Sequence, residues 1–169
     1  MSRELDTWYS LPDLDRLARL GKALEGEIAL LRLTRLATLL SSTDGSVNAT
    51  CLLQAGTDET LQLDLHCSAD IELICQRCLE PMQLTLTSSA SLLVAESESA
   101  ALQNLNDLEL LILDGNRFNP RLLIEDELIV SLPLVAMHQD RSDCGSLARE
   151  LEKLSNEDGD GPGAVPVNH

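Results

Sequence analysis

Apolar and polar residues alternate over most of the chain between residues 46 and 94, which is typical of strands with one buried face. The longest alternating run covers 61–75, where every odd position is apolar and nearly every even position is polar. After a short polar link the parity changes, and a second run covers 82–94. These two runs predict an antiparallel hairpin, and a third run at 46–54 extends it to a three-stranded meander.

Helical spacing occurs on both sides of these strands. Apolar residues recur every three or four positions from 11 to 24, which predicts an N-terminal amphipathic helix. A second helix is expected near 120–132, because Asn119 can cap it and Pro120 suits the first turn of a helix. The segment 26–40 is so dense in apolar residues that a buried strand pair and a helix fit it equally well.

Together these elements predict a single α+β domain over residues 1–154. We expect an antiparallel β-meander sheet of about four to six strands, with a short additional strand at 108–113. Residues 155–169 are rich in glycine and acidic residues and have too few apolar side chains to build a core. We therefore expect them to form a mobile acidic tail.

Composition excludes several classes of protein. The 169 residues include 12 basic and 28 acidic residues, a net charge of −16, so most of the surface repels phosphate. Trp8, Tyr9 and Phe118 are the only aromatic residues, which excludes a surface that stacks nucleic-acid bases. No run approaches the roughly 20 apolar residues that span a bilayer, and the five cysteines are an odd number without an export signal. We therefore expect a cytoplasmic protein, not bound to a membrane, whose thiols are free or metal-bound.

One motif, Cys75 and Cys78 separated by two residues, can carry chemistry. The alternation places it at the tip of the predicted hairpin, where two thiols can face one metal ion as half of a zinc site. His138 and Cys144 are the available partners, and together the four residues would make a Cys3His zinc site that ties the C-terminal segment to the hairpin tip. Against it, the spacing between His138 and Cys144 is wider than in zinc fingers, and there is no second close cysteine pair.

Two other interpretations of this pair remain open. A redox-active dithiol would use the same two cysteines, although no helix follows the predicted strand to stabilise a thiolate with its N-terminus. Alternatively, Cys75 is a core residue and Cys78 a turn residue. Cys51 and Cys67 lie on the buried parity of their strands, and we expect both to be packing residues.

The sequence offers little support for catalysis, and we expect a non-enzymatic protein. None of His66, His138 and His169 stands in the sequence context of a nucleophile and its base. A glycine-rich phosphate loop and a His-Glu-x-x-His motif are both missing from the sequence. The carboxylates of 125–127 could hold a cation, but a solvated helix face is the simpler expectation.

Two segments, in this order and at this separation, resemble the bacterial YceD family over about residues 5–145. They are Cys75-Gln76-Arg77-Cys78-Leu79 and Ile124-Glu125-Asp126-Glu127-Leu128-Ile129-Val130-Ser131-Leu132-Pro133-Leu134-Val135-Ala136-Met137-His138, the second followed shortly by a cysteine. Members are described as large ribosomal RNA subunit accumulation proteins. The resemblance implies a non-enzymatic factor in bacterial large-subunit ribosome biogenesis that supports the synthesis, processing or stability of 23S rRNA. It implies no catalytic residues.

The implied role in rRNA metabolism and the acidic composition lead to different expectations about partners. A protein that grips rRNA ordinarily carries a basic surface, whereas this chain has a net charge of −16. We therefore expect it to act through a basic protein of the large-subunit assembly or rRNA-processing machinery, and to associate with rRNA indirectly. The step affected and the oligomeric state are not indicated by the sequence.

Overall fold

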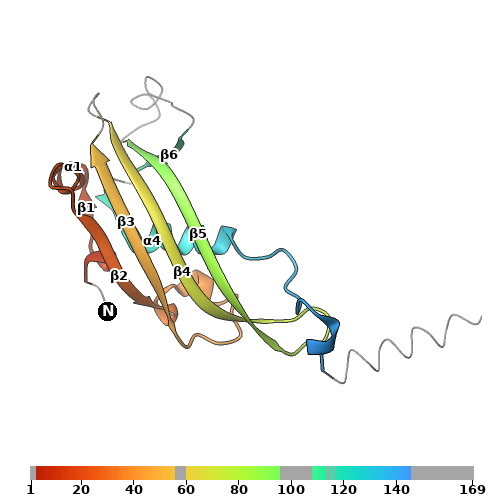
Figure 1. The fold of residues 1–169 in the computed structure, drawn as a ribbon. Helices are drawn as coiled ribbons and strands as arrows, with labels where there is room; N and C mark the ends of the chain where they lie inside the picture. The colour runs from red at the N-terminus through yellow and green to blue at the C-terminus, as the bar shows by residue number, and fades with distance from the viewer. Residues whose placement is uncertain (1–2, 56–59, 96–107, 114, 116, 146–169) are drawn as a thin grey trace, which may run out of the picture. The chain divides into compact units, whose positions relative to one another are not determined.

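The computed structural model describes residues 3–55, 60–95, 108–113, 115 and 117–145 (Figure 1). The chain divides into two compact units. The sheet unit consists of Met1–Leu73 and Gln83–Pro133, and the cysteine unit consists of Ile74–Met82 and Leu134–His169. The predicted α+β class is confirmed. The single domain over 1–154 stays a prediction, and the tail predicted at 155–169 lies outside the described residues.

A five-stranded sheet has the strand order β2-β3-β4-β5-β6. Its strands are β2 (Ala23–Ala29), β3 (Ser46–Ala55), β4 (Leu61–Ile74), β5 (Pro81–Ala95) and β6 (Glu109–Ile112). β2, β3 and β4 pair antiparallel. Side-chain hydrogen bonds join Asp64 to Ser91 and Glu72 to Gln83, so β4 and β5 also run antiparallel. The predicted meander is confirmed, and the strand expected at 108–113 is β6, which pairs parallel to β5.

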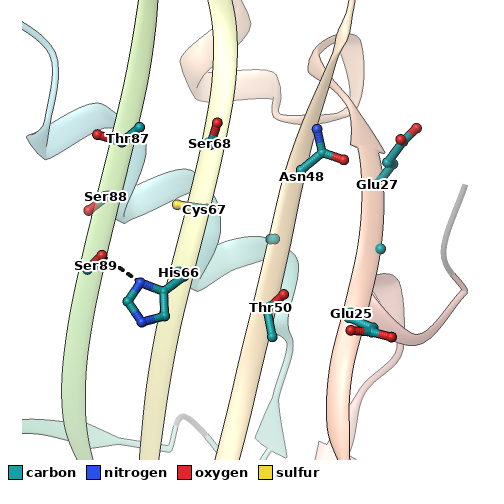
Figure 2. A pocket seen from close by; sticks show the side chains of 12 residues that line it. Glu25, Glu27, Asn48, Thr50, His66, Cys67, Ser68, Thr87, Ser88 and Ser89 are labelled. Carbon is teal, nitrogen blue, oxygen red and sulfur yellow. Dashed lines mark hydrogen bonds between the residues drawn. The ribbon is translucent and has the colours of Figure 1, made fainter.

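Burial alternates along the central strands, as the period of two predicts. The inner face, which the helix α4 (Pro120–Val130) crosses, carries the odd residues of β4, buried from Leu61 to Leu73 (Figure 1). The residues between them line the outer face, part of which is shown in Figure 2. Cys51 and Cys67 lie on the inner face and are 0% and 5% exposed, which confirms them as packing residues.

The helix α1 (Leu11–Arg19) begins with a capping box. Ser10 Oγ accepts a hydrogen bond from the backbone N–H of Asp13, and the Asp13 carboxylate accepts one from the N–H of Ser10. The helix ends before Gly21, whose φ of +61° favours glycine and cannot continue a helix. The predicted N-terminal helix is confirmed, but its extension to 24 is wrong because Leu24 belongs to β2.

The apolar segment 26–40 contains the end of β2 and two short helical elements. A 3-10 turn covers Leu30–Arg32 and the helix α2 covers Thr34–Ala37. The buried side chains of this segment come from β2, from both helical elements and from the residue between them: Ile28 is 2% exposed, and Leu30, Leu33 and Leu36 are fully buried. Its apolar density therefore reflects burial in successive short elements, which no single period could indicate.

The remaining elements of the described residues are short. They are the 3-10 turns η1 (Glu4–Asp6) and η3 (Arg141–Asp143) and the strands β1 (Tyr9–Ser10) and β7 (Arg117–Phe118), which pair antiparallel as a second sheet. Within the described part of the chain, no helix has the length and apolar character that crossing a bilayer requires.

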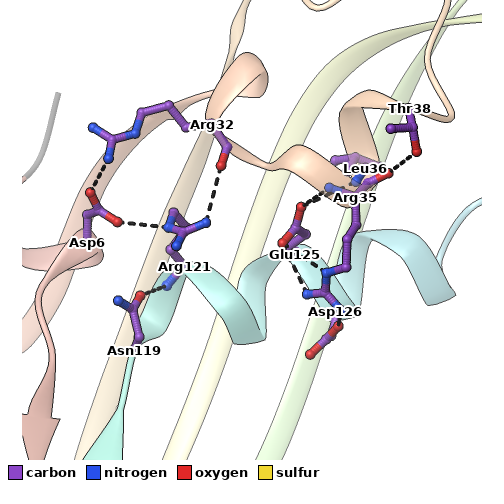
Figure 3. A network of polar contacts seen from close by, with 9 residues as sticks. All are labelled: Asp6, Arg32, Arg35, Leu36, Thr38, Asn119, Arg121, Glu125 and Asp126. Atoms are coloured by element: carbon purple, nitrogen blue, oxygen red, sulfur yellow. Dashed lines mark hydrogen bonds and ion pairs between the residues drawn. The ribbon is translucent and has the colours of Figure 1, made fainter.

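The cluster at 125–127 on α4 is not the solvated face that the sequence predicts. Glu125 is 1% exposed, and its carboxylate accepts hydrogen bonds from the backbone N–H groups of Arg35 and Leu36 at 2.6 and 3.3 Å (Figure 3). The guanidinium of Arg35 donates to Glu125 and to Asp126. The prediction is wrong for Glu125 because this carboxylate satisfies N–H groups that the start of α2 leaves without helical partners.

Candidate metal centre

The turn between β4 and β5 presents the predicted cysteine pair. The N–H of Cys75 donates to Glu80 O at 2.9 Å, and the N–H of Leu79 donates to Cys75 O at 2.8 Å. Leu79 has a φ of +60°, the one non-glycine residue with a positive φ among the described residues. This conformation costs on the order of 1–2 kcal/mol. Because Leu79 is also 64% exposed, burial of its side chain does not offset that cost. The conformation instead shapes the turn that holds Cys75 and Cys78.

The segment after α4 lies against this turn within the cysteine unit. The N–H of Gln76 donates to Ala136 O at 2.8 Å. The short turn η3 then directs the chain back, with the N–H of Cys144 donating to Arg141 O at 3.1 Å. These contacts bring His138 and Cys144 to the hairpin tip, so the structure gathers all four predicted ligands.

The four side chains converge on one point. One potential ligand atom from each of Cys75, Cys78, His138 and Cys144 lies within 4.8 Å of the other three. His138 Nδ1 is 3.4 Å from Cys78 Sγ and 3.7 Å from Cys144 Sγ. Tetrahedral zinc, with Zn–S of about 2.3 Å and Zn–N of about 2.0 Å, separates sulfur and nitrogen ligands by about 3.5 Å. The two distances lie on either side of this value, so the His138 nitrogen is placed to share one zinc ion with Cys78 and Cys144.

The surroundings of the Cys75 sulfur favour a thiolate. Burial raises the pKa of Cys75, but hydrogen bonds from the backbone N–H groups of His138, Cys78 and Arg77 together outweigh burial. The resulting pKa is about 5, below the usual value for a thiol. Burial raises the pKa of Cys78. The Arg77 guanidinium donates to Cys144 Sγ at 3.0 Å, and this bond raises the pKa of Arg77. Three thiolates around zinc carry one net negative charge, which the guanidinium is placed to offset.

Neighbouring groups also fix the two segments that supply the ligands. Arg77 donates to the backbone oxygens of His138 and Asp140 at 2.9 and 3.3 Å. The N–H of Gly145 donates to Glu80 Oε2 at 3.1 Å. A Cβ atom at Gly145 would lie 2.0 Å from Glu80 Oε1, so the missing side chain permits this close approach. Metal sites depend on such outer contacts to orient their ligands.

The donor set distinguishes between the interpretations left open by the sequence. Three sulfurs and one nitrogen suit zinc, and four protein ligands are typical of a structural rather than a catalytic zinc site. Cys75, Cys78 and Cys144 are 0–1% exposed, whereas a redox-active thiol must be reached by its substrate. Burial also places Cys78 in the interior, so it is not merely a turn residue.

Sequence reasoning missed one polar contact on the outer face of the sheet. His66 Nδ1 lies 2.7 Å from Ser89 Oγ across β4 and β5, and both side chains are exposed (Figure 2). The register of the predicted hairpin could have indicated this pair, since the two residues face each other across neighbouring strands. It is a surface contact between polar neighbours and lies in the sheet unit.

The comparison with family models identifies the chain. The model described as large ribosomal RNA subunit accumulation protein YceD matches residues 63–165. The protein belongs to the YceD family. The matched region includes all four residues of the Cys3His cluster, and the resemblance noted in the sequence is confirmed. No curated protein and no solved structure matched the chain.

Proposed function

We propose that this YceD-family protein is a non-enzymatic cytoplasmic factor that supports the synthesis, processing or stability of 23S rRNA, and that a structural zinc ion at Cys75, Cys78, His138 and Cys144 maintains its cysteine unit. The family description supports the role in accumulation of large-subunit rRNA. The observation that carries the zinc assignment is the convergence of four ligand atoms within 4.8 Å of one another.

The composition of the cysteine unit supports a structural role for zinc. Its buried side chains, among the described residues, are Ala136 and the three cysteines, with Met82 packed against the sulfurs. These groups bury little hydrocarbon, so the hydrophobic effect contributes little to folding here. Zinc binding to such sites contributes on the order of 10 kcal/mol, enough to order a small segment that lacks an apolar core.

A basic protein partner is part of this proposal. The net charge of −16 opposes direct binding of RNA and favours association with cationic proteins. A pull-down from cell extract at low and moderate salt, with and without nuclease, checks this part. Large-subunit or processing proteins should be retained after nuclease treatment and released by salt, whereas their complete loss on nuclease treatment would contradict a protein-mediated contact.

A complementation experiment tests the proposed function. The chain is expressed in a bacterial strain that lacks its own YceD-family protein, and both 23S rRNA and the zinc content of the purified protein are measured. The wild type and the control Cys51→Ala should bind about one equivalent of zinc and restore 23S rRNA. Cys78→Ala should lose zinc and fail to restore 23S rRNA. Normal 23S rRNA with zinc-free Cys78→Ala would contradict the proposed role of the metal.

A further inference from the structure

The outer face of the sheet unit is open and acidic across four strands. No lysine or arginine occurs in β2, β3, β4 or β5. The outer face of these strands carries five carboxylates: Glu25, Glu27, Asp64, Asp70 and Glu72. Its negative potential therefore belongs to the surface of the sheet itself and does not depend on the average charge of the chain.

The hydrogen bonds of three of these carboxylates come from neutral donors. Asp64 accepts from Gln54, Gln62 and Ser91 at 2.6–3.3 Å. Asp70 accepts from Thr85 at 2.7 Å. Glu72 accepts from Ser41 and Gln83 at 2.8 and 2.9 Å. Neutral amides and hydroxyls hold the carboxylates in place without cancelling their charge, so a cationic partner meets preoriented acceptors.

The strand register spaces these carboxylates regularly. Asp64 is paired with Leu52, Glu25 with Thr50 and Glu27 with Asn48, and Asp70 and Glu72 continue along β4. One carboxylate therefore lies in each of five consecutive rows of the outer face. Successive rows on one face of a sheet are about 7 Å apart, and so are alternate side chains of an extended polypeptide.

The lateral positions of the carboxylates leave a path between them. Glu25 and Glu27 belong to β2, the other three carboxylates belong to β4, and β3 lies between these strands. Small polar side chains of β3 and β4, including Asn48 and Thr50 of β3 and Ser68 of β4, line a shallow hollow of about 710 Å³ (Figure 2). A hollow of this size accommodates several side chains of a bound segment. Hydroxyl and amide groups along it can bond to peptide groups.

We propose that this outer face binds an extended segment of the basic partner, with lysine or arginine at alternate positions, which lies along β3 between the carboxylates of β2 and β4. This inference rests on the proposed function and names the surface that performs it. A nucleic acid would be repelled by the same charges, and Trp8, Tyr9 and Phe118 all lie outside the four strands. A single metal ion could not engage carboxylates distributed over five rows.

Peptide binding to the full-length protein tests the surface. The probes are a fluorescein-labelled peptide of six Lys-Thr repeats and a block peptide of six lysines followed by six threonines. Fluorescence anisotropy should show tighter binding of the alternating peptide, and Glu27→Gln/Asp70→Asn should weaken it about tenfold. The control Glu4→Gln/Glu109→Gln removes the same charge from exposed sites outside these strands and should change binding less than about twofold. Equal binding of the two peptides, or equal losses in the two variants, would overturn the proposal.

The complementation strain separates this inference from the proposed function. The outer-face variant should retain zinc but restore 23S rRNA less well than the control variant. If the outer-face variant behaves like the wild type in both peptide binding and complementation, the docking surface is overturned and the proposed function still stands. Failure of the wild-type chain to restore 23S rRNA would overturn the proposed function even if the alternating peptide binds as expected.

Discussion

The sheet unit and the cysteine unit are stabilised by different kinds of group. In the sheet unit, the buried leucines of β3 and β4 and of the helices form an apolar core. In the described part of the cysteine unit, Cys75, Cys78 and Cys144 take the place of such a core. The sheet unit can therefore fold by burying hydrocarbon, whereas the cysteine unit depends on what its sulfur atoms bind.

Three buried cysteines show how the environments of a sulfur differ between the two units. Burial among apolar side chains raises the pKa of Cys51 to about 12 and that of Cys67 to about 11. Cys75 is equally buried, yet N–H donors around its sulfur lower its pKa to about 5. The N–H groups aimed at its sulfur, rather than burial alone, distinguish Cys75 from the packing residues Cys51 and Cys67.

Removal of zinc should have the largest effect, and the two units should respond to it differently. We expect a strong chelator to abolish amide protection at residues 74–82, because the cysteine unit loses a contribution on the order of 10 kcal/mol. Residues 61–71 of β4 should keep their protection, since an apolar core holds them. Hydrogen exchange followed by mass spectrometry measures both segments, and added zinc should restore the first. Unchanged protection at 74–82 would contradict the difference between the units.

Glu125→Gln should destabilise the sheet unit without affecting zinc. The amide keeps the size of the carboxylate, but its charge is lost and one of its ends cannot accept from the N–H groups of Arg35 and Leu36. We expect a loss of about 2 kcal/mol in the free energy of unfolding, measured by urea denaturation. The control Asp126→Asn changes an exposed ion pair and should cost less than about 1 kcal/mol. Equal losses in the two variants would show that burial of Glu125 is not decisive.

Cys51→Ser should lower the free energy of unfolding slightly less than Glu125→Gln does. It places a hydroxyl in an apolar part of the inner face, and we expect a loss of about 1–2 kcal/mol. Cys51→Ala, which leaves only a small cavity, should lose about 1 kcal/mol. Both variants should bind one equivalent of zinc, as elemental analysis can measure. Zinc loss in either variant would place Cys51 with the ligands and remove the distinction drawn from burial.

Ser10→Ala should have the smallest effect. It removes the cap of α1 and should cost about 1 kcal/mol near pH 7. Hydrogen bonds from Ser10 lower the pKa of Asp13 below 3.8, so this stabilisation is present above that value and is lost as the pH falls through the lower folded pKa. The difference between wild type and variant, measured by thermal unfolding, should therefore shrink at low pH. A difference independent of pH would show that the Asp13 charge is not involved.

The sequence predicted the features that depend on local periodicity and spacing. Alternation indicated β3, β4 and β5, because one face of each strand is buried. The change of parity after 75 indicated the turn that carries Cys75 and Cys78, and His138 and Cys144 were the remaining thiol and imidazole candidates in the segment after α4. The strands and the turn were predictable because neighbours along the chain determine them, whereas the ligand set rested on matching the few thiol and imidazole side chains.

Features that depend on distant contacts could not be predicted. Burial of Glu125 requires the N–H groups of Arg35 and Leu36, which lie some 90 residues earlier in the chain. The parallel pairing of β6 and the short sheet of β1 and β7 also join distant segments. Nothing in a local period distinguishes a solvated carboxylate from one that caps a remote helix start.

X-ray absorption at the zinc edge of the purified full-length protein tests the central claim most directly. The account predicts one equivalent of zinc with three sulfur ligands at about 2.3 Å and one nitrogen ligand at about 2.0 Å. It also predicts that His138→Ala alters this coordination. Protein that contains no metal yet keeps residues 74–82 protected from hydrogen exchange would contradict the account.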